Sequence, residues 1–222
     1  MTGIDACPGG WVAVTLADRP VGVTAGVTVA KTLDGLGLAS EGITGIDMPL
    51  GLLATGWRTA DLLARRALGR RGSCVFAIPP RPVWEQQAYP DANRRCRELT
   101  GRGMSIQAWG LRGKLLEAGT FRRTKAAPPL YEVHPELSFA ALGDGTPLAD
   151  SKHTPNGLAV RRALLAKAGI VLPPRVPGAA ENDLLDAAAV AWSAGRIAAG
   201  VAITLTDKDQ RADDGLEIAI RC

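Results

Sequence analysis

The stretch GIDACPGGWV (residues 3–12) decides how the rest of the chain is interpreted. It holds a short apolar run that ends in an acid, and the turn signal PGG (residues 8–10) follows at once. Two further runs rich in β-branched residues, 11–17 and 21–30, are separated by a second turn signal at 18–20. Short apolar runs between turns predict a meander of three antiparallel strands.

Downstream of the meander, strands alternate with helices. A short helix is expected at 33–39 and a fourth strand at 43–47. Later strands are expected at 130–134, 201–205 and 216–220, and helices at 59–68, 91–99, 105–118, 156–168 and 182–198. We therefore expect one α/β domain over residues 1–222, with a mixed sheet, helices on both of its faces and a helical insertion at about 52–129.

Composition and charge narrow the class of protein. The chain has 222 residues, of which 46% are hydrophobic and 22% charged, as in globular domains and unlike disordered chains or coiled coils. Residues 58–125 carry 15 Lys and Arg against 5 acidic residues, and the remainder carries 11 against 17. A basic insertion favours binding to a polyanion. A solvated, Arg-rich helical surface is the alternative explanation.

Targeting and cysteine signals are absent from the sequence. No basic and apolar signal sequence precedes the first motif, and no run of about 18 apolar residues could span a bilayer. We expect a cytoplasmic protein with no membrane partner. The four cysteines lack the paired spacing of a zinc site or a redox dithiol, so free thiols are expected.

The tripeptide Gly-Ile-Asp occurs twice, at 3–5 and at 45–47, and residues that end a strand follow each copy. Adjacent strands lie about 4.8 Å apart, so two parallel neighbours would bring Asp5 and Asp47 to one cation. Mg²⁺ prefers such hard oxygen ligands. The alternative is that each Asp caps a turn through its own backbone.

A third acidic feature is NDLLDAAAVAW (residues 182–192). Asp183 and Asp186 are three residues apart and share one face of the expected helix. The alanines that follow leave little bulk between this helix and a sheet. Acids in a first helical turn also interact favourably with the helix dipole, by about 0.3–1 kcal/mol, and this is the competing explanation.

Together, five motifs resemble an uncharacterised bacterial and archaeal family of predicted RNase-H-like nucleases, over nearly the whole chain. They are GIDACPGGWV (3–12), GIDMPLGL (45–52), YEVHPELSF (131–139), SK (151–152) and NDLLDAAAVAW (182–192). The resemblance implies an RNase-H-like fold. In the wider superfamily, which includes Holliday-junction resolvases, acids on the first strand, the fourth strand and the final helix bind two Mg²⁺ ions. The matching positions are Asp5, Asp47 and either Asp183 or Asp186, and the middle acid is Glu in those resolvases.

The activity that the resemblance implies is hydrolysis of phosphodiester bonds with Mg²⁺ or Mn²⁺. One ion would lower the pKa of a bound water and a second would stabilise the leaving oxygen. Glu132 and His134 are two residues apart and would face the same way on a strand, as a further ligand and a proton carrier. Lys152 could neutralise phosphate charge. A strand-edge histidine and a surface lysine are the alternatives.

Nucleic acid is the partner expected for the basic insertion, because arginine grips phosphates. The candidate substrate-binding residues are Arg65, Arg71, Arg122 and Arg123. One alternative function is a nucleotide-hydrolysing or phosphotransfer enzyme on the related actin-like fold, although that fold requires two such domains. Another is a nucleic-acid-binding module without activity. A catalytic function requires that the carboxylates converge in the folded protein.

Overall fold

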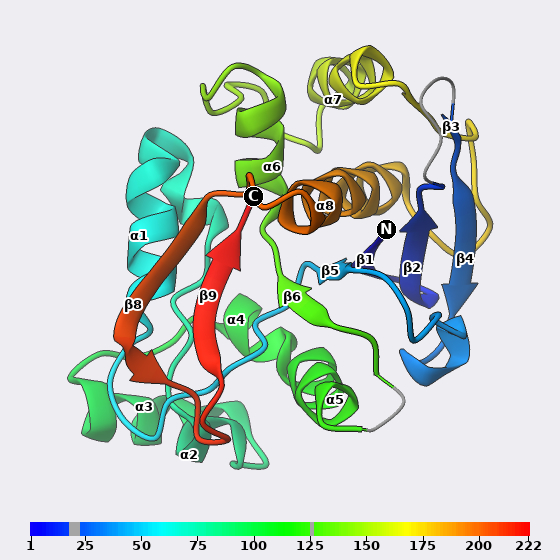
Figure 1. Ribbon diagram of the computed structural model, residues 1–222. Coiled ribbons are helices and arrows are strands. Elements are labelled where there is room, and N and C mark those ends of the chain that lie inside the picture. Colours follow the sequence, from blue (N-terminus) through cyan, green and yellow to red (C-terminus); the bar gives the residue numbers. More distant parts are fainter. Residues whose placement is uncertain (18–22, 125–126) are drawn as a thin grey trace. The chain divides into compact units, whose positions relative to one another are not determined.

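The fold is described from a computed structural model, in which residues 1–17, 23–124 and 127–222 are described (Figure 1). The chain divides into two compact units. The first unit comprises Met1–Met48, Phe121–Ile203 and Arg221–Cys222. The second comprises Pro49–Thr120 and Thr204–Ile220. The expected turn at 18–20, the start of the strand expected at 21–30, and Lys125 of the basic segment lie outside the described residues.

A five-stranded mixed sheet organises the first unit. Its order is β4 (Gly26–Ala30), β2 (Gly10–Thr15), β1 (Thr2–Cys7), β5 (Thr44–Ile46) and β6 (Leu130–Glu132). β4, β2 and β1 are antiparallel neighbours, whereas β5 runs parallel to β1 and β6 parallel to β5. This topology confirms the predicted α/β class and meander, and it is consistent with an RNase-H-like fold.

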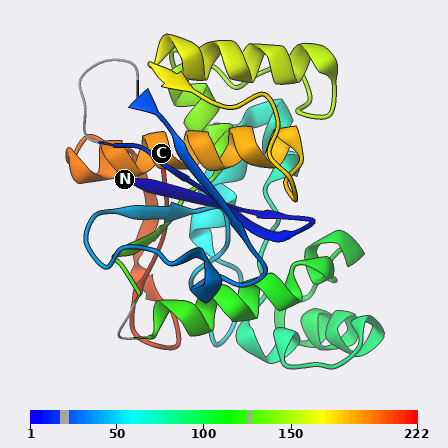
Figure 2. The same cartoon turned by 90° about the vertical axis from the view of Figure 1, so that its right-hand side faces the viewer.

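Helices of the first unit pack in layers on one face of this sheet. They are α6 (Pro135–Leu142), α7 (Pro155–Lys167) and α8 (Glu181–Ala198). α8 packs across β1, β2 and β5, and both α6 and α7 contact α8 (Figure 2). A separate two-stranded parallel pair consists of β3 (Val23–Thr24) and β7 (Ile170–Val171).

Close contact between α8 and the sheet depends on two glycines. A Cβ atom added at Gly3 would lie 2.1 Å from the backbone nitrogen of Ala191 and 2.2 Å from the carbonyl oxygen of Ala187. A Cβ added at Gly45 would lie 2.8 Å from Cγ1 of Val190. Real Cβ atoms do not approach other heavy atoms this closely. The glycines of the two repeated tripeptides therefore allow the helix to rest almost on the strand backbones.

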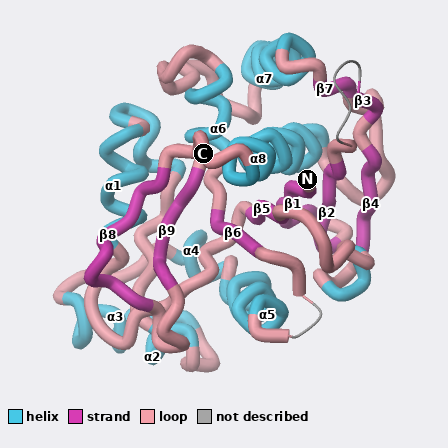
Figure 3. Tube along the Cα trace, in the orientation of Figure 1, coloured by secondary structure: helices cyan, strands magenta, loops and turns pink. Residues whose placement is uncertain are grey.

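Helices and one strand pair make up the second unit. Its elements are α1 (Thr59–Ala67), η2 (Gly69–Cys74), α2 (Arg81–Trp84), α3 (Tyr89–Thr100), α4 (Ile106–Gly110), most of α5 (Arg112–Arg122), β8 (Thr204–Arg211) and most of β9 (Glu217–Arg221). β8 pairs with β9, and α1 packs against β8 (Figure 3). The buried guanidinium of Arg58 forms an ion pair with Asp61, and Asp61 also accepts a hydrogen bond from the backbone of Ile78.

Several of the expected elements were wrong in extent. Over its described residues, the strand expected at 21–30 is divided into β3 and β4, and β3 pairs with β7 outside the five-stranded sheet. The helix expected at 33–39 is a single 3-10 turn, η1 (Asp34–Leu36), because Gly37 adopts a left-handed φ of 60° and ends it. The helix expected at 105–118 is divided at Leu111 into α4 and α5, next to Gly110, a poor helix former. The first strand of the terminal pair, expected at 201–205, runs from Thr204 to Arg211 as β8.

Helix α6 was not predicted at all. Its residues Pro135–Ala140 are all buried, so the segment has no polar face and lacks the periodicity by which a surface helix is identified. Two other expectations can be compared directly with the structure. All four cysteines are free. Among the described residues, no helix combines the length and apolar character needed to cross a bilayer.

The contact at Gly3 gives a first testable prediction. Gly3→Ala places a methyl group against the backbone of α8, which cannot move aside as a flexible side chain would. We expect a loss of unfolding free energy of about 1–3 kcal/mol, measured by urea denaturation. Gly26→Ala is the matched control, because its Cβ would meet atoms of Thr15 only at 3.9 Å. Equal losses in the two variants would contradict the proposed role of this contact.

Candidate metal centre

The two strand-end acids lie side by side in the sheet. β1 and β5 pair in parallel with Gly3 opposite Gly45 and Ile4 opposite Ile46. The backbone N–H of Asp47 donates to the carbonyl oxygen of Ile4 at 2.9 Å, which extends the pairing to the end of both tripeptides. Because side chains alternate along a strand, each Asp leaves the sheet on the same face as the glycine two residues earlier. That face is the one covered by α8.

Helix α8 supplies the third carboxylate. Ligand oxygens of Asp5, Asp47 and Asp186 all lie within 4.8 Å of one another, and these three residues are called the acid cluster below. Asp186 immediately precedes Ala187, the residue that contacts Gly3. The close contact of α8 with Gly3 therefore also brings the carboxylate of Asp186 to the strand ends.

A lysine faces the acid cluster. Lys152 lies in the loop before α7, and its Nζ donates to Oδ2 of Asp186 at 2.5 Å. Its side chain is 29% exposed, against 2% for that of Asp186. The alternative interpretation of Lys152 as an ordinary surface lysine was therefore wrong, because its ammonium group is held by a buried carboxylate.

Burial dominates the electrostatics of the acid cluster. Asp5 and Asp186 are buried and Asp47 is partly buried. Loss of solvation raises the pKa of all three carboxyl groups, and the neighbouring carboxylates raise the pKa of Asp5 and Asp47 further. The pKa of Asp47 rises from 3.8 to about 8 even though Lys152 opposes the shift. Without a divalent cation, the cluster therefore retains protons at neutral pH.

The pKa of Lys152 is also set by burial and by the neighbouring acids. Burial lowers the pKa of its ammonium group, but the charges of Asp186, Asp5 and Asp47 together outweigh that effect and leave the pKa above its ordinary value. Lys152 is therefore a permanent positive charge, which partly compensates the three acids.

The donor set fits a hard divalent cation. Two oxygens that bind one Mg²⁺ at 2.0–2.1 Å are at most about 4.2 Å apart. The oxygens of the acid cluster lie within 4.8 Å of one another, so a small rotation of the side chains would close them on an ion. When all three carboxylates are ionised, they and one lysine also carry an excess of negative charge in a buried place, which a divalent cation would balance.

Asp183 has a different environment from Asp186. Its Oδ2 accepts from the backbone N–H of Ala180 at 3.3 Å, and its Oδ1 accepts from the side-chain amide of Asn182 at 2.6 Å. These bonds cap the first turn of α8. Of the two acids that the sequence left as alternatives, Asp186 lies in the acid cluster and Asp183 caps the helix.

The expected roles of Glu132 and His134, as a further ligand and a proton carrier, stay a prediction. β6 ends at Glu132, and His134 is the residue that precedes helix α6, whose first position is Pro135. Glu132 is paired with Ile46, so strand alternation directs it away from the face of Asp47. Glu132 is buried, and its charge still contributes to the raised pKa of Asp47.

Sequence reasoning missed a buried ion pair beside the cluster. The guanidinium Nη2 of Arg161 on α7 donates to both carboxylate oxygens of Glu136 on α6, at 2.8 and 2.9 Å. Nη1 of Arg161 also donates to the carbonyl oxygen of Asp150, two residues before Lys152. Glu136 belongs to the YEVHPELSF motif, but no sequence signal paired it with an arginine 25 residues later.

The four arginines expected to bind substrate are divided between the units. Arg65 is exposed on α1 and Arg71 is partly buried in η2, both in the second unit. Arg122 and Arg123, at and just after the end of α5, belong to the first unit. The role of these residues in substrate binding stays a prediction.

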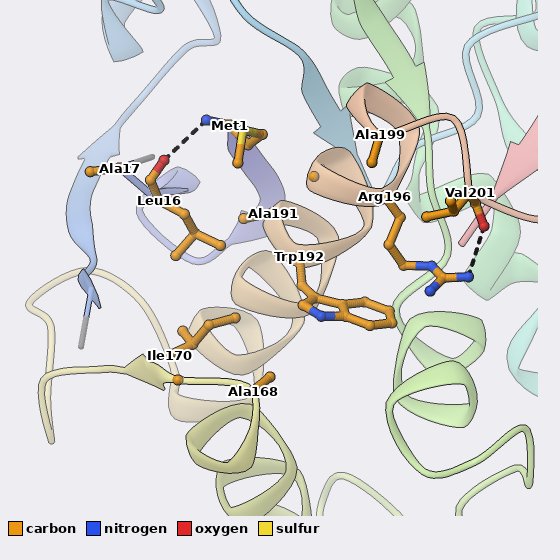
Figure 4. Close-up of a pocket in the computed structure, with 12 residues that line it drawn as sticks. Met1, Leu16, Ala17, Ala168, Ile170, Ala191, Trp192, Arg196, Ala199 and Val201 are labelled. Carbon is orange, nitrogen blue, oxygen red and sulfur yellow. Dashed lines mark hydrogen bonds between the residues drawn. The ribbon is translucent and has the colours of Figure 1, made fainter. Parts of the chain in front are cut away.

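A separate apolar cavity of about 300 Å³ lies in the first unit (Figure 4). Leu16, Ile170 and Trp192 contribute to its lining, and the guanidinium of Arg196 lies 5.0 Å from the centre of the Trp192 indole. Arg196 also donates to the carbonyl oxygen of Val201. No residue of the acid cluster lines this cavity, so it does not contribute to the candidate metal centre.

The raised pKa of Asp47 gives a prediction about stability. The unfolded chain releases this proton near pH 4 and the folded protein near pH 8, so the folded state binds more protons between these values. The metal-free protein should therefore lose stability as pH rises from about 4 to about 8. Thermal unfolding in EDTA across this range measures the effect.

The variant Asp47→Asn should flatten this pH dependence, because an amide does not titrate. Asp34→Asn, at an exposed position outside the acid cluster, is the control and should leave the dependence unchanged. A midpoint that rises with pH in the metal-free protein, or an identical slope in Asp47→Asn, would be inconsistent with the charge balance described above.

The residues of the site lie within the span of a known protein family. A family model described as "Protein of unknown function (DUF429)" matches residues 3–211, a span that includes the acid cluster and Lys152. No curated protein and no solved structure matches the chain. The chain belongs to the DUF429 family, whose function is unknown.

Proposed function

We propose that the protein is a metal-dependent nuclease that hydrolyses phosphodiester bonds with Mg²⁺ or Mn²⁺. The observation that carries the proposal is the convergence of Asp5, Asp47 and Asp186, from two strand ends and one helix, within 4.8 Å. A carboxylate set of this kind suits an oxygen-coordinated divalent cation. The resemblance of the sequence motifs to predicted RNase-H-like nucleases supports the choice of phosphodiesters as substrates.

Each group of the site has a distinct part in this proposal. Asp5, Asp47 and Asp186 hold the cation. When bound, the cation supplies Lewis-acid chemistry, which polarises the phosphoryl group and makes a water more acidic. Lys152 adds positive charge where negative charge develops on the phosphate. The buried pair of Glu136 and Arg161 fixes the backbone near Lys152 through the bond to Asp150.

A mechanism with two ions requires more oxygen ligands than the acid cluster provides. Asp183 lies one turn before Asp186 and its charge acts on Asp5, which makes it a candidate for the additional ligand. Its present bonds to Ala180 and Asn182 favour a capping role instead. We therefore propose one ion held by the acid cluster as the minimal catalytic unit.

Nucleic acid is the proposed substrate class because the insertion is rich in arginine. The side chains of Arg65 and Arg123 are exposed, as contact with a phosphate backbone requires. An interaction of this kind would weaken steeply with salt, since each phosphate contact releases counterions. The alternatives are phosphotransfer on nucleotides and nucleic-acid binding without cleavage.

Cleavage assays test the proposal directly. Purified protein is incubated with Mg²⁺ or Mn²⁺ and with single-stranded, duplex, branched and hybrid nucleic acids. Asp5→Asn, Asp47→Asn and Asp186→Asn should each reduce the cleavage rate about a hundredfold or more, because each removes a ligand of the cation. Asp183→Asn should reduce the rate less than about tenfold, as expected for weakening of a helix cap.

The exposed variant Asp34→Asn serves as the inert control in these assays. Absence of cleavage on every substrate, or cleavage that Asp5→Asn does not reduce, would rule out the nuclease proposal. Binding of nucleic acid without cleavage would favour the non-catalytic alternative. Release of phosphate from nucleoside triphosphates, lost in Asp5→Asn, would favour the phosphotransfer alternative.

A further inference from the structure

Lys152 occupies the place of a cation beside the acid cluster. Its ammonium group is 2.5 Å from Oδ2 of Asp186, and its charge acts on Asp5 and Asp47 as well. The lysine is the more exposed partner of the Asp186 ion pair, with 29% exposure against 2%. The lysine side chain is therefore partly accessible to solvent, whereas the carboxylate is buried.

The backbone that carries Lys152 is fixed on both sides of the residue. Upstream, Arg161 donates to the carbonyl oxygen of Asp150 at 3.1 Å. Downstream, the hydroxyl of Thr154 donates to the carbonyl oxygen of Ser151 at 2.9 Å. The anchor Arg161 is fully buried. Any exchange at the site therefore involves the flexible four-carbon side chain of Lys152 and not a movement of the loop.

Charge balance alone would allow the lysine and one divalent cation to occupy the site together. Three ionised carboxylates and one ammonium group leave two negative charges, which one divalent cation neutralises. Asp186 nevertheless has to take part both in the ion pair with Lys152 and in the cation site. A cation that approaches Asp186 therefore meets a positive charge a few ångströms away, and repulsion between them weakens its binding.

We propose that Lys152 is an exchangeable counter-cation, which pairs with Asp186 in the metal-free protein and is displaced from it when a divalent cation binds. This inference rests on the proposed function, since it assumes that the acid cluster is a metal site. It adds a means by which the chain sets its own metal affinity. The alternative is a supporting role, in which Lys152 holds Asp186 in the geometry that the metal needs.

Direct titration with Mn²⁺ alone distinguishes the two roles. Isothermal titration calorimetry at a fixed alkaline pH compares the wild-type protein with Lys152→Met, which removes the charge but keeps most of the side-chain volume. We expect Lys152→Met to bind Mn²⁺ at least about tenfold more tightly, because the competing charge is absent. Lys167→Met, at an exposed position on α7, is the matched control and should bind as the wild type does.

Thermal unfolding provides a second measurement. In EDTA, Lys152→Met should melt below the wild-type protein, because three buried acids lose their partner, and Mn²⁺ should raise its midpoint more than that of the wild type. If Lys152→Met does not fold without metal, Lys152→Gln removes the charge and retains a hydrogen-bond donor for Asp186. The same tightening is expected for it.

The possible outcomes separate this inference from the function on which it rests. Unchanged or weaker Mn²⁺ binding in the Lys152 variants, with clear binding by the wild type, would overturn the exchange and leave the metal site intact. Absence of Mn²⁺ binding in the wild type and in both variants would overturn the metal site and the exchange together. Binding that appears only in the variants would mean that Lys152 excludes the cation instead of exchanging with it, and would also overturn the inference.

Discussion

The contact between two strand glycines and helix α8 is the constraint on which the rest of the first unit depends. Gly3 leaves room for the backbone of α8 at Ala187 and Ala191, and Gly45 leaves room for Val190. A helix that packs against ordinary side chains would lie farther from the sheet. Because Asp186 adjoins Ala187, its carboxylate reaches the strand ends only at this short distance. The small size of the two glycines therefore determines both the packing of α8 on the sheet and the position of Asp186 in the acid cluster.

The repeated tripeptide Gly-Ile-Asp provides both a close contact for α8, through its glycine, and a carboxylate for the acid cluster. Strand alternation puts its glycine and its aspartate on the same face, while the isoleucine between them points into the opposite face and is buried. The parallel register of β1 and β5 then places the two tripeptides in line. The spacing of Asp5 and Asp47 is consequently set by backbone hydrogen bonds between β1 and β5, which are stiffer than contacts between side chains. Three acids are held close together at the expense of their solvation, and this raises the pKa of each.

Local patterns were sufficient to predict the meander, a fourth strand and the approach of an alanine-rich helix. Parallel pairing of that fourth strand with β1 was a hypothesis, which the register of the two strands confirms. They did not discriminate Asp183 from Asp186, since that choice depends on where along its axis the helix meets Gly3. They also did not predict the ion pair of Lys152 with Asp186, since the position of Lys152 follows from a loop anchored by the buried Arg161. Helix α6 was missed because a helix buried on all sides has no amphipathic period. These three failures concern contacts between segments far apart in the sequence.

The acid cluster is held by strands and a helix, whereas Lys152 is held by a flexible side chain on a loop. The backbones that carry the carboxylates are held by strand register and by the packing of α8, so the mutual repulsion of the carboxylates opposes that packing. Compensation must therefore come from protons, from the Lys152 ammonium group or from a metal ion. Of these, the lysine is attached to the chain by a flexible stem on an anchored loop, and it is always present. A site built in this way keeps its acids together in the absence of metal, because the lysine and bound protons limit the repulsion that would otherwise separate α8 from the sheet.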